Sequence, residues 1–167
     1  LAGYDLAAQK YFSWGQPVGG YDIAPDGNTL AYDNLTYIPS GEERIVLTTL
    51  QGDQEKLFST GLAAKEYAFA PQFSPDGAYL AYQISSGLDD PRSYRLVVQP
   101  LNVDAGAPRT LLQSDTIAGV EWSTDGSQLL VTVGPYDAPQ IVLVNFADGS
   151  SQTLAQGWMP AWQPLRR

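Results

Sequence analysis

The chain has 167 residues, 44 % of them hydrophobic, which is enough for one domain with a sizeable core. Nine basic residues against 18 acidic ones give a net charge of −9, which disfavours binding to nucleic acid or to an anionic membrane, and no apolar run approaches the roughly 18 residues that would span a bilayer. Cys and His are absent, which excludes disulfides, thiolate or imidazole metal ligands, and a Ser-His-Asp triad.

The sequence predicts short β-strands throughout and almost no helix, because no segment of ten or more residues has a 3.6-residue apolar period. The first two strands are expected at residues 4–6 and 10–13. Three sets of four strands follow in the same order, at 21–24, 29–32, 44–50 and 55–59, then 70–74, 79–84, 94–101 and 109–113, then 119–123, 128–133, 140–146 and 152–156. A last strand is expected within residues 158–164.

One stretch, residues 73–82, organises the chain because the sequence repeats it. It reads as an aromatic residue, the turn Ser-Pro-Asp-Gly and an apolar strand, and versions of it lie at residues 23–32 and 122–131. The turn glycines Gly27, Gly77 and Gly126 are 50 and 49 residues apart. Pro, Asp and Gly suit successive positions of a tight turn, so we expect hairpins whose Asp side chains bond the local backbone.

Four antiparallel strands in each repeat of 40 to 50 residues are typical of a β-propeller blade. The expected architecture is an all-β array: residues 1–13 as outer strands of a partial blade, 18–60, 68–113 and 117–156 as repeats, and 158–164 as the inner strand of a further blade. Kelch repeats fit less well, because Gly19-Gly20 is the only glycine doublet, and Trp-Asp repeats would contain His.

The repeated turn resembles that of the TolB-like, WD40-like propellers, whose hallmark is an aromatic residue followed by Ser-Pro-Asp-Gly and an apolar strand. Residues 73–77 match this pattern fully, whereas residues 23–27 and 122–126 depart from it at one or two positions. The resemblance implies a propeller fold and a non-enzymatic binding or scaffolding role, in a periplasmic or extracellular setting. It also leaves open a regulatory propeller of a larger enzyme, as in prolyl oligopeptidase-like proteins.

The sequence predicts no catalytic, cofactor or metal site. No Gly-x-Ser-x-Gly nucleophile elbow and no Asp-x-Asp-x-Asp-Gly calcium loop occurs. Two adjacent carboxylate pairs, Glu42-Glu43 and Asp89-Asp90, lie in long polar loops rather than on a rigid scaffold, so a solvated role is expected for them.

The loops that follow the second strand of each repeat differ while the strands recur, and function concentrates in such loops. With the connections between repeats, they provide the candidate residues for binding a protein, peptide or glycan. These are Trp14, Tyr37, Glu42, Glu43, Asp89, Asp90, Arg92, Tyr136 and Asp137. The alternative for Trp14 and Trp158 is that they pack between repeats as part of the core. For Tyr37 and Tyr136, exposure and burial are equally open.

Three full repeats are fewer than the four or more blades of a closed propeller. The end segments would supply two outer strands and one inner strand of another blade, leaving its second strand unaccounted for. The first residue is Leu rather than Met, so a piece of a longer protein is the first expectation. A dimer with shared blades is the second, and an incompletely closed four-bladed monomer is the third. In each open form we expect self-association through the terminal strands, because unpaired strand edges invite pairing.

Overall fold

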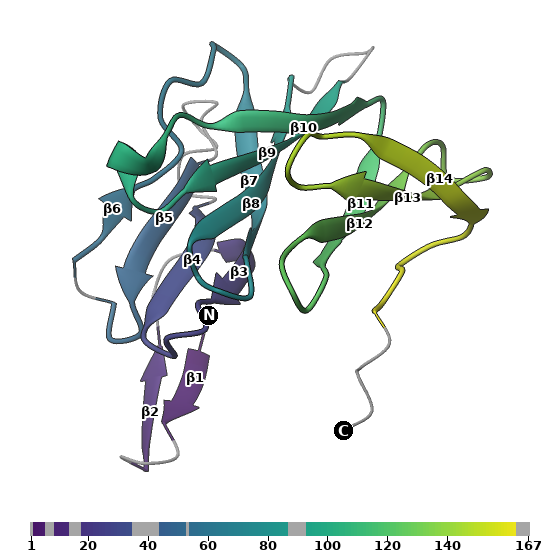
Figure 1. Ribbon diagram of the computed structural model, residues 1–167. Coiled ribbons are helices and arrows are strands. Elements are labelled where there is room, and N and C mark those ends of the chain that lie inside the picture. The colour runs from purple at the N-terminus through teal and green to yellow at the C-terminus, as the bar shows by residue number, and fades with distance from the viewer. Residues whose placement is uncertain are drawn as a thin grey trace.

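Short antiparallel strands form nearly all of the regular structure in the chain (Figure 1). The computed structural model describes residues 2–5, 9–13, 18–34, 44–52, 54–86 and 93–162. Within these ranges the one helical element is the short 3-10 turn η2 (Val103–Ala105). No helix among the described residues is long and apolar enough to cross a membrane. The prediction of an almost helix-free chain is therefore confirmed for the described residues.

Twelve of the strands form three four-stranded sheets, and each sheet uses its strands in chain order. Blade 1 consists of β3 (Val18–Ile23), β4 (Thr29–Asn34), β5 (Arg44–Thr49) and β6 (Lys56–Leu57). Blade 2 consists of β7 (Tyr67–Phe73), β8 (Tyr79–Ser85), β9 (Tyr94–Pro100) and β10 (Arg109–Ser114). Blade 3 consists of β11 (Ile117–Trp122), β12 (Gln128–Val133), β13 (Gln140–Asn145) and β14 (Ser151–Gln156). The predicted blade array is confirmed.

The first two strands, β1 (Ala2–Asp5) and β2 (Lys10–Ser13), pair with each other in a separate two-stranded sheet. Their register joins Ala2 to Ser13 and Asp5 to Lys10. Figure 1 shows this hairpin on the blade 1 side of the array, with blade 3 at the opposite side.

The repeated turn has the conformation that its residues predict. Gly27, Gly77 and Gly126 have φ angles of 69°, 69° and 71°, in the left-handed region that glycine enters without steric cost. In the second turn the Asp76 carboxylate accepts hydrogen bonds from the Ala78 N–H at 3.0 Å and the Ser74 hydroxyl at 2.6 Å. The turn Asp side chains therefore bond their own loops, as expected.

Replacing Gly77 by Ala should lower the free energy of unfolding by about 1 kcal/mol, because a side chain at positive φ is strained. Space is not limiting, since the nearest atom to an added Cβ would be Pro25 Cδ at 3.5 Å. Gly119 is a matched control, because its φ is not in the left-handed region and an added Cβ would lie 3.8 Å from Thr132 Oγ1. Urea unfolding curves for both variants measure the difference, and equal stability of the two would contradict the assigned turn.

The blades pack face to face through apolar side chains that alternate along the strands. Blades 1 and 2 share a buried cluster that includes Ile45, Phe58, Leu80 and Tyr82. Between blades 2 and 3, a second cluster contains Leu96, Val98, Trp122, Leu129, Val131 and Val144. Leu101 and Phe146, which begin the turns after β9 and β13, pack against the cluster of the preceding blade. The turns after β9 and β13 thus help to hold neighbouring blades together.

Two carboxylates of blade 1 fasten it to the inner strand of blade 2. Asp33, at 2 % exposure, accepts hydrogen bonds from the N–H groups of Gly19 at 2.7 Å, Gly20 at 2.7 Å and Ala70 at 3.0 Å. Asp22 accepts from the Phe73 N–H at 2.8 Å. Since Ala70 and Phe73 lie on β7, these bonds cross from one blade to the next. Burial raises the pKa of Asp22, and its two backbone hydrogen bonds oppose that rise.

Candidate functional site

The loops that vary between repeats emerge at one end of the blades. In a four-stranded antiparallel blade, the connection after the second strand and the connection to the next blade must lie at the same end. We call this end the loop face; among the described residues it includes 60–66, 134–139 and 157–158. The opposite end, with the Pro-Asp-Gly turns, is the turn face.

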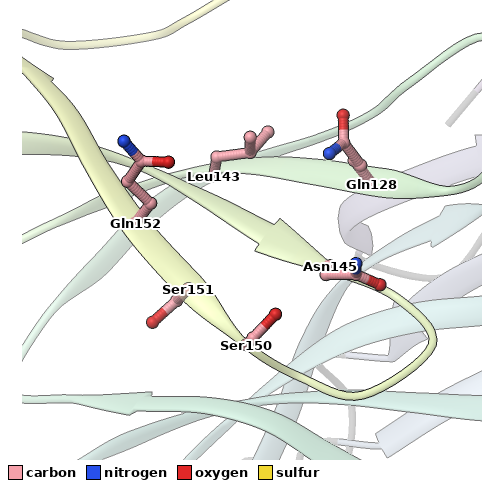
Figure 2. A pocket seen from close by; sticks show the side chains of 6 residues that line it. All are labelled: Gln128, Leu143, Asn145, Ser150, Ser151 and Gln152. Atoms are coloured by element: carbon pink, nitrogen blue, oxygen red, sulfur yellow. The ribbon is translucent and has the colours of Figure 1, made fainter.

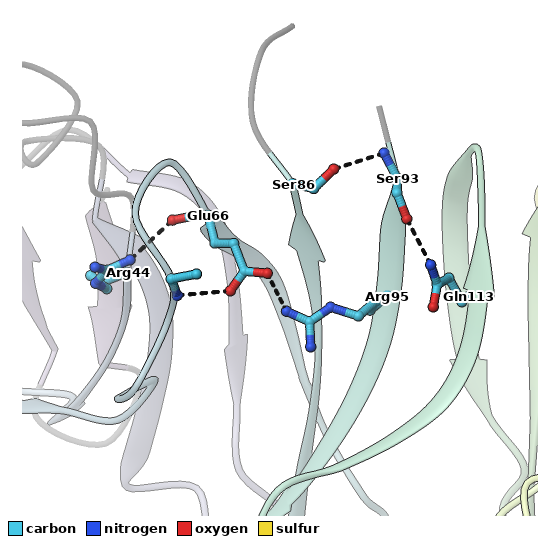
Figure 3. Close-up of polar contacts among 7 residues, drawn as sticks. Arg44, Glu66, Ser86, Ser93, Arg95 and Gln113 are labelled. Carbon is cyan, nitrogen blue, oxygen red and sulfur yellow. Dashed lines mark hydrogen bonds and ion pairs between the residues drawn. The ribbon is translucent and has the colours of Figure 1, made fainter. Parts of the chain in front are cut away.

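Glu66 ties blades 1 and 2 together on the loop face (Figure 3). Its Oε1 atom forms an ion pair of 2.5 Å with Arg95 Nη2, at the start of β9, and its Oε2 atom accepts from the Ala63 N–H at 2.9 Å. The Glu66 carbonyl accepts from Arg44 Nη1, at the start of β5, at 3.1 Å. The Glu66 and Arg95 side chains are 17 % and 32 % exposed, so solvent weakens the pair only in part. This network fixes the connection 60–66 between two strand ends.

Two serines close the base of the second variable loop (Figure 3). The Ser93 N–H donates to Ser86 Oγ at 3.0 Å, and the Ser86 N–H donates to the Ser93 carbonyl at 2.9 Å. Gln113 on β10 adds a bond from Nε2 to Ser93 Oγ at 3.1 Å. These bonds join the chain on either side of residues 87–92, which lie outside the described residues.

The third variable loop, residues 134–139, is fully described and holds an exposed aromatic side chain. Its backbone is fixed by a bond from the Ala138 N–H to the Pro135 carbonyl at 3.0 Å and one from the Gly157 N–H to the Pro139 carbonyl at 3.1 Å. Tyr136 is 86 % exposed, and its ring centroid lies 5.3 Å from that of Trp158, which is 38 % exposed. A hydrogen-bonded loop thus presents a pair of aromatic rings to solvent.

The structure places two of the nine predicted site residues. Tyr136 and Asp137 are adjacent and exposed on the loop face. Trp158 contacts Tyr136 at the surface and is 38 % exposed. The remaining predicted residues lie outside the described residues: Trp14, Tyr37, Glu42, Glu43, Asp89, Asp90 and Arg92.

The sequence analysis missed the Arg44–Glu66–Arg95 network. A signal was present, because Arg44 and Arg95 occupy equivalent positions in their blades. The residue after each arginine pairs with the fifth residue of the second strand: Ile45 pairs with Asp33 of β4, and Leu96 pairs with Gln83 of β8. Two arginines at equivalent positions near the start of third strands stand out in a chain with nine basic residues. The partner Glu66 lies in a connection whose length differs between repeats, so its pairing could not be predicted from sequence spacing.

The described part of the chain holds no group of three residues able to bind a metal ion, and the altered pKa values have structural causes. Hydrogen bonds within the turns lower the pKa values of Asp26, Asp76 and Asp148, and that of Asp125 to about 2. Burial raises the pKa of Tyr82 to about 12. Because these groups serve turns or the core, none of them marks a reaction centre.

No protein-family model and no curated protein matches the sequence. Among solved structures, a TolB from Agrobacterium tumefaciens is similar over 83 % of this chain and 46 % of its own, with a TM-score of 0.62 and 21 % identity. An oligogalacturonate lyase in complex with manganese is similar over 92 % of this chain and 41 % of its own, with a TM-score of 0.70 and 17 % identity. A puromycin-hydrolysing peptidase of Mycobacterium tuberculosis matches over 83 % of this chain and 23 % of its own, with a TM-score of 0.62 and 18 % identity.

The chain therefore spans less than half the length of each of these three proteins. Their identities are low, so the similarity concerns the fold, and a propeller fold hosts both binding proteins and enzymes. The repeated turn, which is Ser-Pro-Asp-Gly at residues 74–77, and the three sequential four-stranded sheets agree with that similarity. The chain is an array of β-propeller blades with a TolB-like fold.

Proposed function

We propose that the chain is a non-enzymatic binding module that recognises a protein or peptide partner on its loop face. The observation that carries this proposal is the Tyr136–Trp158 pair, held on a hydrogen-bonded loop with Asp137 beside it. Aromatic side chains in rigid positions bury a large area at little entropic cost, and they are enriched among residues that dominate binding energy.

The neighbouring parts of the loop face support the same role. Glu66 and its two arginines hold the connection between blades 1 and 2, and Ser86 and Ser93 bond each other on either side of the sequence Gly-Leu-Asp-Asp-Pro-Arg. A fixed scaffold with variable loops is how many binding surfaces are built. The TolB-like fold is consistent with this proposal and with a periplasmic or extracellular setting.

Replacing Tyr136 by Ala should weaken binding of selected peptides about tenfold or more, because loss of a central aromatic anchor costs about 2 kcal/mol. The probe is a displayed library of random peptides, selected on the whole chain and then measured singly by biolayer interferometry. Tyr21→Ala is the matched control, since Tyr21 is 53 % exposed but lies within β3, away from the loop ends.

Peptides that lose affinity for Tyr136→Ala but not for Tyr21→Ala would support the proposed site. Peptides that bind both variants like the wild type would show that the Tyr136–Trp158 pair is not the binding surface. If the library yields no binder, the same measurement on a glycan array distinguishes a sugar ligand from the absence of any loop-face ligand.

A second candidate is a regulatory propeller within a larger enzyme. The similarity to the peptidase, of which this chain matches 23 %, is the observation that favours it. The genomic sequence on both sides of the region encoding this chain decides between the two. An adjoining α/β-hydrolase domain would favour the regulatory role, and its absence would favour a separate binding module.

A further inference from the structure

A pocket with a volume of about 350 Å³ lies between blades 2 and 3 on the turn face. Most of its wall belongs to blade 2, and the turn between β13 and β14 of blade 3 closes one side. We call it the junction pocket; it is lined by Tyr79, Val98, Pro100, Arg109, Phe146, Ala147 and residues 105–107. Its volume is at the low end for ligand pockets, which suits a small chemical group rather than a large ligand.

Arg109 is the charged group of the junction pocket, and blade 3 holds its side chain in place. Its Nη1 atom donates to the carbonyl of Ala147 at 2.7 Å, and its Nη2 atom donates to that of Phe146 at 2.5 Å. Its Cζ atom lies 5.1 Å from the centroid of the Phe146 ring, a cation–π contact. A guanidinium has five N–H donors, so Arg109 is oriented by these contacts and still has donors for a ligand.

No carboxylate of the described residues forms an ion pair with Arg109, whose polar contacts are the two carbonyls and the Phe146 ring. Asp148, in the same turn as Phe146, accepts instead from the Ser150 N–H at 2.9 Å. Hydrogen bonds from Ser150 are the main cause that lowers the pKa of Asp148, and the charge of Arg109 contributes least. The net charge of −9 opposes anion binding, but salt screens distant charges beyond about 8 Å at physiological ionic strength. The positive charge of Arg109 is therefore available to an anion that enters the pocket.

The corresponding positions of the other two blades lack this combination of residues. By strand register, Lys56 in blade 1 and Gln152 in blade 3 are the counterparts of Arg109. The first residue of the second strand also differs between the blades: it is Thr29, Tyr79 and Gln128 in turn. Figure 2 shows the pocket at these positions of blade 3, whose lining contains neither a charged nor an aromatic side chain. An arginine beside aromatic rings is therefore specific to blade 2, and the repeated fold does not require it.

We infer that the junction pocket binds a carboxylate that is attached to a small apolar group, with the carboxylate on Arg109. Charge-assisted hydrogen bonds from a guanidinium to a carboxylate are among the strongest in proteins. The Phe146 ring, which lies 4.8 Å from the Tyr79 ring, and Pro100 provide apolar surface for the rest of the ligand. The rim at residues 105–107 is exposed and consists of Ala-Gly-Ala, so no large side chain covers the entrance. Such a carboxylate is found at the C-terminus of a peptide and in a free organic acid, and the site is separate from the loop face.

Isothermal titration calorimetry of the whole chain tests the inference with two pairs of probes. One pair is N-acetyl-leucine and its amide, and the other is the peptide acetyl-Ala-Ala-Leu with a free or an amidated C-terminus; only the acids should bind. Arg109→Gln should weaken binding of the acids about tenfold or more, because it removes the charge-assisted hydrogen bonds. Ala107→Trp should weaken it as well, because it fills the entrance and leaves Arg109 unchanged. Lys56→Gln is the matched control, since it removes the same charge at the equivalent position of blade 1.

Weaker binding of the acids to both Arg109→Gln and Ala107→Trp, with Lys56→Gln like the wild type, would support the inference. Tighter binding of the peptide acid would then identify a peptide C-terminus as the source of the carboxylate, and tighter binding of N-acetyl-leucine would identify a free acid. Equal binding of acids and amides would overturn it, as would unchanged affinity in Arg109→Gln or the absence of binding by both acids. None of these outcomes depends on Tyr136, so the two binding sites can fail separately.

Discussion

Replacing Asp33 by Ala should lower the free energy of unfolding by about 2 to 4 kcal/mol, because a charged hydrogen-bond acceptor is lost and its donors stay partly buried. The carboxylate accepts from Gly19, Gly20 and Ala70, and an added methyl group at either glycine would clash with it, so the fit is close. The loss should affect blades 1 and 2 together, since Ala70 belongs to β7. Urea unfolding followed by tryptophan fluorescence measures it.

Two variants make the Asp33 result specific. Asp33→Asn keeps one acceptor oxygen in place and should lose less stability than Asp33→Ala. Asp137→Ala removes an exposed carboxylate from a loop and should change the free energy of unfolding by less than about 0.5 kcal/mol. If Asp33→Ala unfolds at the same urea concentration as the wild type, the bonds between the blades contribute nothing to stability.

Lowering the pH from about 4 toward 2 should destabilise the protein, because the turn carboxylates are more acidic in the folded state. The pKa values of Asp26, Asp76 and Asp148 are lowered, and that of Asp125 lies at about 2. As the pH falls, these carboxylates therefore take up protons in the unfolded chain before they do so in the folded one. The stabilisation that they provide is present above the pKa of about 4 that Asp has in the unfolded chain, and it is lost below that pH. The melting temperature should fall by several degrees across this window.

One carboxylate acts in the opposite direction. Burial raises the pKa of Asp22, so the folded state holds that proton more tightly and gains stability as the pH falls. The four lowered groups outnumber it, and the net effect is acid destabilisation. Asp125→Asn should flatten the dependence between about pH 4 and 2, while Asp137→Asn changes the net charge equally and serves as the control. A melting temperature that rises on acidification would mean that Asp22 outweighs the turns.

The fold was predictable because strand pattern and turn chemistry agree in every repeat. Twelve strands form in the predicted order, and the turn glycines Gly27, Gly77 and Gly126 have the expected left-handed backbone. Strand ends were less predictable. β7 begins at Tyr67 rather than at residue 70, because a bulge between Phe69 and Gln72 lets pairing continue past Ala70 and Pro71.

At β6, pairing stops at Leu57 instead of extending to residue 59, because the N–H groups of Phe58 and Ser59 both turn to the carbonyl of Ile45. The expected last strand is not formed over residues 159–162, and residues 163–164 lie outside the described part of the chain. These differences depend on contacts between distant segments, which a local pattern of residues does not record.

The candidate site was predictable only where a single exposed side chain carries it. Tyr136 could be proposed because it is an aromatic residue in a loop that differs between repeats, but the sequence left its burial open, and only the structure shows that it is 86 % exposed. The contact of Tyr136 with Trp158 joins two segments that are 22 residues apart, and the ion pair of Glu66 with Arg95 joins two that are 29 apart. Both contacts join residues at the ends of different strands, so they depend on the assembled blades and are not recorded in the local sequence.

The bonds at the inner strands all run in one direction along the chain. Phe73 and Ala70 of blade 2 donate to carboxylates of blade 1, Trp122 of blade 3 donates to blade 2, and Trp162 donates back to blade 3. At its inner strand, each of these blades therefore accepts hydrogen bonds from the blade that follows it in the chain. Duplication or deletion of a whole blade in the gene would preserve that polarity at every junction, so arrays of different lengths are accessible to evolution without redesign of their interfaces.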